Sequence, residues 1–440
     1  MLTPTRLVTG AAVMALVACT IKPIDAGNEE IRFWAFGAEG EVVQQLMPDF
    51  ERENPGAHVR VQQIPWTAAH EKLLTAFVGN ATPDVAQLGN TWIAEFVALD
   101  ALRPLDPFIA ASKTLKKDAY FKGIWETNVM DGVTYGIPWY VDTRVMFYRK
   151  DLLARAGYDS VPTTWTGWHA AMEAVKKQQG AGSYAIFLPT NEWTQPLILG
   201  MQAGSPLLKD GGRYGAFSDP PFRRAFDFYV SLFKDGLAPV AGNQDIANVY
   251  QEFARGTFAM YPTGPWNIGE FRRRLPADMQ DKWAASPFPG PDGDSSRVST
   301  AGGASIVLFK GSRHQTLAWK LAEFLSRPEQ QVRFAKLTGD LPARLEAWKD
   351  KSMTKDPAQR EFYAQLQRVS PLPKVPEMEL IASKVIEAAE KSIRGNVPSA
   401  RALADLDKDV NRILEKRRWM LARDSARGAS GVGRRAAVTP

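Results

Sequence analysis

Residues 31–64, IRFWAFGAEGEVVQQLMPDFERENPGAHVRVQQI, contain two strand patterns separated by a helix pattern. IRFWAF (31–36) alternates as a strand does and ends before Gly37. The apolar side chains of the next segment recur at helical spacing and are Val42, Val43, Leu46, Met47 and Phe50. Pro55 stands beyond the end of this predicted helix, and HVRVQQI (58–64) predicts the second strand.

The same alternation continues after this unit. HEKLLTAFVG (70–79) predicts a second helix and PDVAQLG (83–89) a third strand. The order strand-helix-strand-helix-strand predicts an α/β fold with a parallel sheet covered by helices. Ligands bind such sheets at the carboxyl ends of the strands. The loops expected there contain aromatic, carboxylate or amide groups and are FGAEG (36–40), IPW (64–66) and GNTW (89–92).

The rest of the chain repeats this mixture and then becomes mainly helical. VMFYR (145–149) and GTFAMYPTG (256–264) predict strands, and residues 164–178 predict a helix with Thr164 as its N-cap. A single long helix is predicted from about 378 to 419. A chain of 440 residues is expected to form two domains.

The formal charge of +6 is concentrated at the carboxyl end. Residues 417–440 contain Asp424 and the arginines Arg417, Arg418, Arg423, Arg427, Arg434 and Arg435. The remainder of the chain is therefore close to neutral, and no basic groove for nucleic acid is predicted. Residues 421–440 are rich in Gly, Ala, Ser and Arg, which predicts a disordered basic tail.

The first residues have the pattern of an export signal. MLTPTR precedes the apolar run 7–18, which is too short to span a bilayer. Leu16-Val17-Ala18-Cys19 resembles the lipobox of bacterial lipoproteins, in which the chain is cleaved before the cysteine and its sulfur is acylated. We therefore expect a signal peptide over 1–18 and a lipid at Cys19, the only cysteine; the alternative is a plain signal peptide with an incidental cysteine.

Enzyme signatures are missing from the sequence. It contains no HExxH, GxSxG, Walker A or CxxC motif, and its four histidines are scattered. No catalytic residue, metal site or cofactor is therefore predicted. A carboxylate pair for glycoside hydrolysis remains open, because no spacing singles out one pair among the many Asp and Glu.

Three loops combine aromatic and polar residues. They are WYVDTR (139–144), NEWTQP (191–196) and PTGPWN (262–267). A sugar ring has an apolar C–H face and a rim of hydroxyls, so a carbohydrate site needs flat aromatic surfaces beside carboxylate, amide or guanidinium groups. The recurrence of this combination favours carbohydrate binding over ordinary loop packing.

Longer stretches of the chain resemble the family-1 extracellular solute-binding proteins of ABC sugar importers, which include maltose- and trehalose-binding proteins. The stretches that carry the resemblance span about 30 to 345 and include KLLTAFVGNATPDVAQLGNTW, YGIPWYVDTRVMFYRKDLLARAG, VPTTWTGWHAAMEAVKK, GTFAMYPTGPW, AGGASIVLFKGS and TGDLPAR. The resemblance implies a two-lobed periplasmic-binding-protein-like fold, each lobe a mainly parallel sheet flanked by helices. VDTRVMF and AGGASIV would be the hinge crossings. Lobe 1 would comprise 27–141 and 304–345, and lobe 2 would comprise 143–302 and 346–420.

The resemblance also implies ligand residues. Asp142 matches a carboxylate at the crossing point that accepts sugar hydroxyls, and Trp266 matches a stacking aromatic in the GPW motif. Less tightly matched positions complete the expected site, which contains Glu39, Asn90, Thr91, Trp92, Trp193, Gly302, Gly303 and Arg344. Tyr140 and Arg144 are ligand contacts or hinge packing. Many relatives carry a charged pair where this chain has Asn90 and Thr91, which leaves the sugar undetermined.

Together these patterns predict the substrate-binding component of an ABC transporter. We expect a periplasmic, lipid-anchored monomer that closes around a di- or oligosaccharide, such as the glucose disaccharides trehalose or maltose, and delivers it to the permease transmembrane subunits. The alternatives are a secreted carbohydrate-active enzyme, a sensory lipoprotein without a permease, and a binding protein for a non-sugar solute such as glycerol phosphate or a polyamine. Phosphate would require a cluster of Arg and Lys, and a polyamine several carboxylates.

Overall fold

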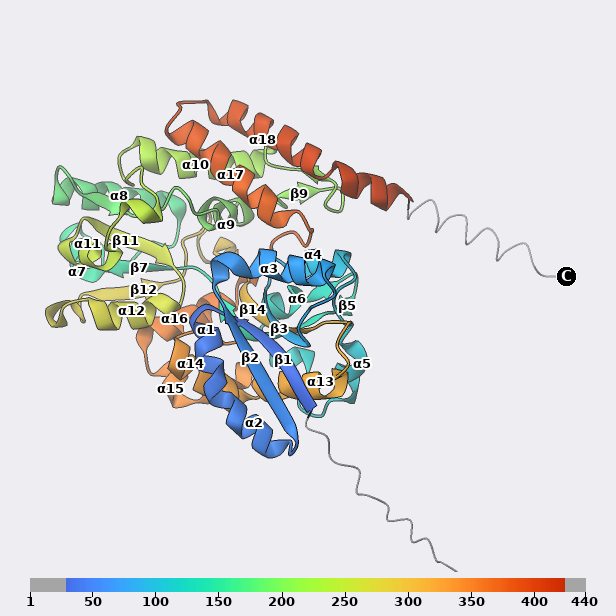
Figure 1. Cartoon of the computed structure of the whole chain (residues 1–440). Helices are drawn as coiled ribbons and strands as arrows, with labels where there is room; N and C mark the ends of the chain where they lie inside the picture. Colours follow the sequence, from blue (N-terminus) through green and yellow to red (C-terminus); the bar gives the residue numbers. More distant parts are fainter. Residues whose placement is uncertain (1–28, 424–440) are drawn as a thin grey trace, which may run out of the picture.

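The computed structural model describes residues 29–423, which are arranged around two β-sheets (Figure 1). The predicted signal peptide 1–18, the predicted lipidation site Cys19 and most of the predicted basic tail lie outside the described residues. Within 29–423, no helix combines the length and the hydropathy needed to cross a membrane.

The first sheet has six strands in the order β15-β6-β14-β3-β1-β2. Their bounds are β1 (Glu29–Phe36), β2 (Ala57–Ile64), β3 (Val85–Gly89), β6 (Gly136–Asp142), β14 (Gly302–Leu308) and β15 (Leu341–Pro342). Strand β1 pairs in parallel with both β2 and β3, as the sequence predicts for the first three strands. All five residues of β3 are buried, as expected for a strand with covered faces.

The expectation of a mainly parallel sheet is wrong for the remaining pairs. Strand β14 lies antiparallel between β3 and β6, and β15 pairs antiparallel with β6. The register explains this direction, because the first residue of β14, Gly302, pairs with the last residue of β6, Asp142. The chain leaves the first sheet at Asp142 and returns beside the same point, so the returning strand must run in the opposite direction.

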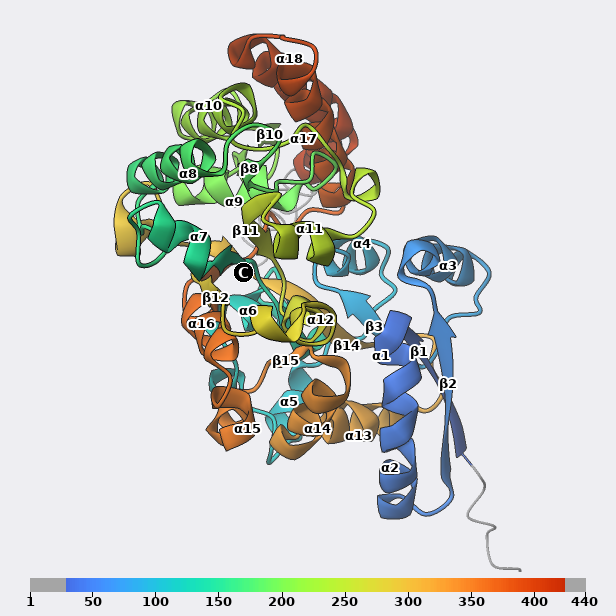
Figure 2. The same ribbon diagram turned by 90° about the vertical axis from the view of Figure 1, so that its left-hand side faces the viewer.

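Helices cover both faces of the first sheet (Figure 2). They are α1 (Gly37–Val42), η1 (Val43–Leu46), α2 (Met47–Glu53), α3 (Trp66–Val78), α4 (Ile93–Ala98), α5 (Asp106–Ala111), η2 (Lys117–Ala119), α6 (Lys122–Glu126), α13 (Gln315–Leu325) and α14 (Pro328–Thr338). The helix predicted after β1 is divided into α1, η1 and α2. Pro48 lies in the first turn of α2, where its missing N–H costs no helical hydrogen bond.

The second sheet has four strands in the order β12-β7-β11-β8. Their bounds are β7 (Val145–Arg149), β8 (Tyr184–Ile186), β11 (Phe258–Thr263) and β12 (Trp283–Ser286). This sheet is also mixed, since β11 is parallel to β8 whereas β7 is antiparallel to both β11 and β12. The helices that follow these strands are α7 (Lys150–Arg155), α8 (Trp165–Gln179), α9 (Thr194–Gln202), α10 (Pro220–Lys234), α11 (Val249–Arg255) and α12 (Trp266–Arg274). The Thr164 side chain caps α8, as predicted, by accepting a 3.1 Å hydrogen bond from Gly167 N.

The C-terminal part of the chain packs against both sheets. It comprises η6 (Leu345–Lys349), α15 (Lys351–Thr354), α16 (Pro357–Leu366), β16 (Val369–Ser370), α17 (Met378–Ile393) and α18 (Ser399–Ile413). The prediction of one long helix over 378–419 is wrong, because α17 and α18 are separate helices packed on each other. Asn396 has a φ of 54°, and Pro398 directly precedes α18. Both residues interrupt the pattern of helical hydrogen bonds between α17 and α18.

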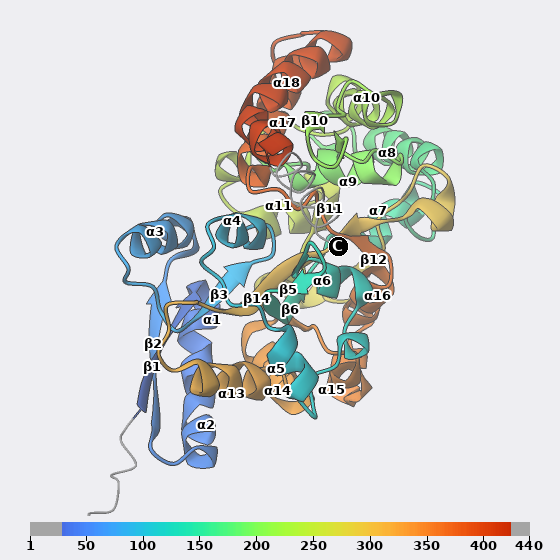
Figure 3. The same cartoon turned by 90° about the vertical axis from the view of Figure 1, so that its right-hand side faces the viewer.

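The two sheets are joined by segments that lie close together (Figure 3). Residues 143–144 connect β6 to β7, and β14 follows directly on β13 (Ser299–Thr300). The Ser299 hydroxyl donates to the Arg144 carbonyl at 3.1 Å and accepts from the Arg144 N–H. A third connection leads from β16, which pairs with β13, into α17. The predicted hinge segments VDTRVMF and AGGASIV coincide with the first two connections.

Candidate functional site

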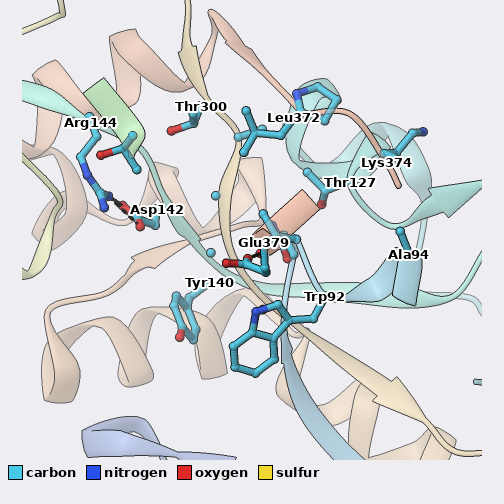
Figure 4. A pocket seen from close by; sticks show the side chains of 18 of the residues that line it. Trp92, Ala94, Thr127, Tyr140, Asp142, Arg144, Thr300, Leu372, Lys374 and Glu379 are labelled. Atoms are coloured by element: carbon cyan, nitrogen blue, oxygen red, sulfur yellow. Dashed lines mark hydrogen bonds and ion pairs between the residues drawn. The ribbon is translucent and has the colours of Figure 1, made fainter. Parts of the chain in front are cut away.

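A cavity of about 540 Å³ lies between the two sheets, beside these connections. Its lining contains every predicted ligand residue except Arg344, namely Glu39, Asn90, Thr91, Trp92, Tyr140, Asp142, Arg144, Trp193, Trp266, Gly302 and Gly303. Figure 4 shows Asp142 and Arg144 on one side of the cavity and Trp92 on another. The fold therefore gathers residues that are far apart in the sequence into one site.

Asp142 and Arg144 form an ion pair at the end of β6. Arg144 Nη1 donates to both carboxylate oxygens of Asp142, at 2.6 and 2.8 Å. Burial raises the pKa of Asp142, and the charge of Arg144 opposes that rise. The guanidinium carbon of Arg144 lies 4.9 Å from the centre of the Trp266 ring, in a cation–π contact. Tyr140, Asp142, Arg144 and Trp266 therefore form one connected wall of the cavity.

Glycines allow the close packing of this wall. A Cβ at Gly264 would lie 2.0 Å from Trp266 Cζ3, so the residue before Pro265 must lack a side chain for the indole to fold back. Gly303 has a φ of 117°, and a Cβ there would lie 2.3 Å from the Tyr140 carbonyl oxygen. The GPW motif and the paired glycines thus have a steric reason in this structure.

Glu39 lies at the amino end of α1 and accepts two hydrogen bonds from neutral donors. Tyr140 Oη donates to Glu39 Oε1 at 3.2 Å, and Trp66 Nε1 donates to Glu39 Oε2 at 3.3 Å. Tyr140 Oη also accepts a 2.9 Å hydrogen bond from Gln87, which is fully buried in β3. Burial raises the pKa of Glu39, although these hydrogen bonds oppose the rise. Tyr140 is thus both a cavity residue and a packing residue.

Asp340 is a further acid in the cavity that the sequence did not single out. It precedes β15, whose Leu341 pairs with Val141, so it lies beside the end of β6. Its exposed fraction is 8%. Burial and the charges of Glu39 and Asp142 hold the pKa of Asp340 well above its usual range.

The loop after β3 supplies polar side chains that accept and donate hydrogen bonds. The Asn90 side chain accepts a 3.0 Å hydrogen bond from the Ser305 hydroxyl, while its Nδ2 is buried without a partner among the described residues. Thr91 Oγ1 donates to Glu379 Oε1 on α17 at 2.5 Å. Asn90 therefore lines the cavity but keeps its unpartnered amide nitrogen buried, and Thr91 links the loop to the C-terminal part of the chain.

Aromatic rings form the wall on the side of the first sheet. The Trp66 and Trp92 rings are 5.7 Å apart at 68°, and both pack against Phe36. Trp66 belongs to the IPW loop noted in the sequence, but it was not among the predicted ligand residues. Trp193, the N-cap residue that precedes α9, reaches the cavity on the side of the second sheet.

Arg344 does not line the cavity. Its side chain is buried within the first lobe, where Nη1 donates to the carbonyls of Thr114 and Ser326 and the guanidinium packs over the Tyr120 ring. The main chain of Arg344 forms an antiparallel bridge with Tyr120, whose ring the guanidinium also covers. We therefore withdraw Arg344 from the predicted ligand residues.

Residues 371–379 form a wall that no sequence motif indicated. Pro371, Leu372, Pro373, Lys374 and Glu379 all line the cavity. Lys374 Nζ donates to the carbonyls of Glu126 and Val129, at 3.2 and 2.6 Å. Thr127 and Met130, beside those carbonyls, also line the cavity. Because these segments meet only through the tertiary fold, local sequence patterns could not reveal this wall.

Comparison with known proteins identifies the family. The family model of bacterial extracellular solute-binding proteins matches residues 36–332. The chain belongs to the bacterial extracellular solute-binding proteins. The two-lobed α/β fold predicted from the sequence is confirmed by the solved structure of the sugar-binding protein MalE from Xanthomonas citri, which has a TM-score of 0.87.

This solute-binding protein is similar to several known proteins. Its identity with Xanthomonas citri MalE is 46%, over 90% of this chain and 99% of that chain. It is 26% identical to the diacetylchitobiose binding protein DasA of Streptomyces coelicolor, over 68% of each chain. It is 25% identical to a binding protein of Brucella abortus, over 93% of this chain and 98% of the relative.

Proposed function

We propose that this solute-binding protein captures a di- or oligosaccharide in the cavity between its lobes. The observation that carries the proposal is the combination of Trp66, Trp92, Trp193 and Trp266 with carboxylate, amide and guanidinium groups around one space. Indole faces suit the C–H face of a sugar ring, and the carboxylates of Glu39 and Asp142 and the amide of Asn90 suit its hydroxyls. A glucose disaccharide such as trehalose or maltose is the ligand that we expect.

Two relatives support the class of ligand. Xanthomonas citri MalE is described as a sugar-binding protein, and DasA as a diacetylchitobiose binding protein. The first is similar over nearly its whole length, so its cavity and this one are built on the same framework. This similarity supports a saccharide ligand and leaves its identity and linkage to experiment.

The proposal includes delivery of the sugar to an ABC permease. We propose that the protein works as a monomer on the periplasmic side of a membrane, held there by a lipid at Cys19 after removal of residues 1–18. The lobes close around the sugar and release it to the transmembrane subunits. Mass spectrometry of the membrane-extracted protein checks the anchor, because a diacylglyceryl group on Cys19 would appear as a defined mass increase.

A screen of sugars by thermal unfolding tests the ligand. A sugar that binds only the folded protein raises the melting temperature, by an amount that grows with its concentration relative to Kd. We expect trehalose or maltose to raise it, and glycerol phosphate and putrescine to leave it unchanged. Incubation of each disaccharide with the protein should release no glucose, whereas hydrolysis would indicate the enzyme alternative.

Substitution of Trp266 tests the site. Trp266 is 39% exposed, so Trp266→Ala should leave the melting temperature nearly unchanged. Loss of a stacking surface should weaken sugar binding by roughly 5- to 150-fold, as a contribution of about 1–3 kcal/mol predicts. The matched control is Trp419→Ala, a 58% exposed tryptophan outside the cavity. Equal affinities for both variants by calorimetry would contradict the proposed site.

A further inference from the structure

The charges that line the cavity are mainly negative. Carboxylates reach it from four elements or their ends, and they belong to Glu39, Asp142, Asp340 and Glu379. The cationic side chains in the lining belong to Arg144 and Lys374. Glu192, in an adjoining cavity of about 240 Å³, adds a further carboxylate near Arg144.

Both cations are already engaged. Arg144 is bonded to Asp142 through two contacts and stacks on Trp266. Lys374 Nζ donates to two main-chain carbonyls. An anionic group on a ligand would therefore have to displace one of these interactions to find a positive partner.

Glu39 and Asp340 have no cationic partner within the described residues. Glu39 accepts only from the neutral donors Tyr140 and Trp66 and from main chain, and no ion pair reaches Asp340 in residues 29–423. Both acids line the same cavity, and the charge of Glu39 raises the pKa of Asp340, so the pair resists any further negative charge beside it. A hydroxyl, amide or amine of a ligand would donate to this pair, whereas a second anion would be repelled.

We infer that Glu39 and Asp340 determine specificity by rejecting saccharides that carry a carboxylate or a phosphate and by accepting neutral ones. This inference rests on the proposed function and names the class of sugar. A unit charge about 6 Å from an unpaired carboxylate, at an effective dielectric constant of about 20, is repelled strongly enough to weaken binding by roughly 100-fold.

Matched ligands test the inference by calorimetry. The disaccharide that binds is compared with its 6-carboxylate and its 6-carboxamide, which have nearly the same shape and differ in charge. We expect the carboxamide to bind at least tenfold more tightly than the carboxylate. In the double variant Glu39→Gln with Asp340→Asn, that ratio should fall at least tenfold, even if both affinities decrease. The control Glu41→Gln removes a charge from an exposed position of the same helix and should leave the ratio unchanged.

Each result decides a different claim. The inference is overturned if the carboxamide and the carboxylate bind with equal affinity, whether or not both bind more weakly than the parent disaccharide. Such a result would show that the charge of the ligand does not affect binding. An unchanged ratio in the double variant overturns the assignment to Glu39 and Asp340. If neither trehalose, maltose nor any other saccharide of the screen binds, the proposed function itself fails and this inference fails with it.

Discussion

Because Asp142 and Arg144 form an ion pair, a substitution at either position changes the stability of the protein as well as its sugar binding. The Arg144 side chain is only 12% exposed, and Asp142 is the carboxylate bonded to it. Asp142→Ala would leave a buried guanidinium unpaired, which is strongly destabilising. A loss of sugar binding in Asp142→Ala would therefore be accompanied by a loss of stability. Asp142→Asn keeps a hydrogen-bond acceptor beside Arg144 and is the better test of sugar binding.

Asp340 gives a stability prediction with a defined pH dependence. Its pKa in the folded protein is raised by burial above the ordinary value of 3.8. As the pH rises above 3.8, the unfolded chain loses this proton first, so the folded state becomes progressively less stable until the raised pKa is passed. Asp340→Asn should therefore increase the free energy of unfolding at pH 8 and change it little at pH 4, as measured by urea denaturation.

The control for Asp340→Asn is the same type of substitution at a solvent-exposed carboxylate. Asp131→Asn replaces an exposed acid whose positive φ asparagine tolerates. It should change the free energy of unfolding little at either pH. A gain for Asp340→Asn that is equal at pH 4 and pH 8 would show that charge is not its cause.

Individual site residues were predictable where a motif carried them. Asp142, Trp266 and Asn90 lie in stretches that share the pattern of the family, and all three line the cavity. Asp340 lies in TGDLPAR, a stretch that shares the family pattern but does not mark this acid as a ligand residue, and Glu379 lies in a helical segment with no distinguishing pattern. Arg344 lies in a recognisable motif, but its side chain bonds to the carbonyls of Thr114 and Ser326, which no local pattern indicates. Sequence patterns thus locate loops better than side-chain directions.

Among the elements, strand β14 depends most on a single residue. Gly303 combines a positive φ with a contact distance that leaves no room for a methyl group. Gly303→Ala should destabilise the protein by about 1–3 kcal/mol and displace Tyr140 from the cavity wall. Thermal unfolding and sugar calorimetry measure the two effects. Gly311→Ala is the control, because its nearest neighbour would be 3.6 Å away and its φ is not positive; equal behaviour of both variants would contradict the steric argument.

Elements with strong local signals were the ones that the sequence predicted well. The strand at 145–149 and the helix begun by Thr164 agree with β7 and α8 because alternation and capping are local properties. The direction of β14 is not local, since it follows from where the chain re-enters the sheet. The break between α17 and α18 had a local signal in Gly395, Asn396 and Pro398, which the periodic apolar pattern obscured.

At the scale of the whole molecule, the C-terminal segment links the lobes across the cavity. The Thr91–Glu379 hydrogen bond and the two bonds of Lys374 cross from one side to the other. The predicted boundaries, 27–141 with 304–345 and 143–302 with 346–420, remain a proposal. The strands of the two sheets agree closely with these boundaries, except that β14 begins at Gly302. Helix α16, which falls within 346–420, packs against β12 of the second sheet.

These cross-lobe contacts predict a shift of the opening equilibrium. Lys374→Ala removes hydrogen bonds that exist only when the lobes are close, so the open state should become more populated without sugar. We expect sugar affinity to fall about five- to tenfold, as a net loss of about 1 kcal/mol implies, and the radius of gyration to increase in small-angle X-ray scattering. Lys384→Ala, whose partner Glu387 lies on the same helix, is the control. An unchanged scattering curve and affinity for Lys374→Ala would contradict the prediction.

The position of β14 has a consequence for synthesis. This strand fills the centre of the first sheet, yet the chain makes it only after all strands of the second sheet. A growing chain that has not reached residue 302 leaves β3 and β6 without their shared neighbour, and it also lacks the wall at 371–379. The first lobe therefore cannot mature domain by domain as the chain emerges. Late completion of the first sheet therefore keeps the nascent polypeptide loosely folded until most of the chain has been made.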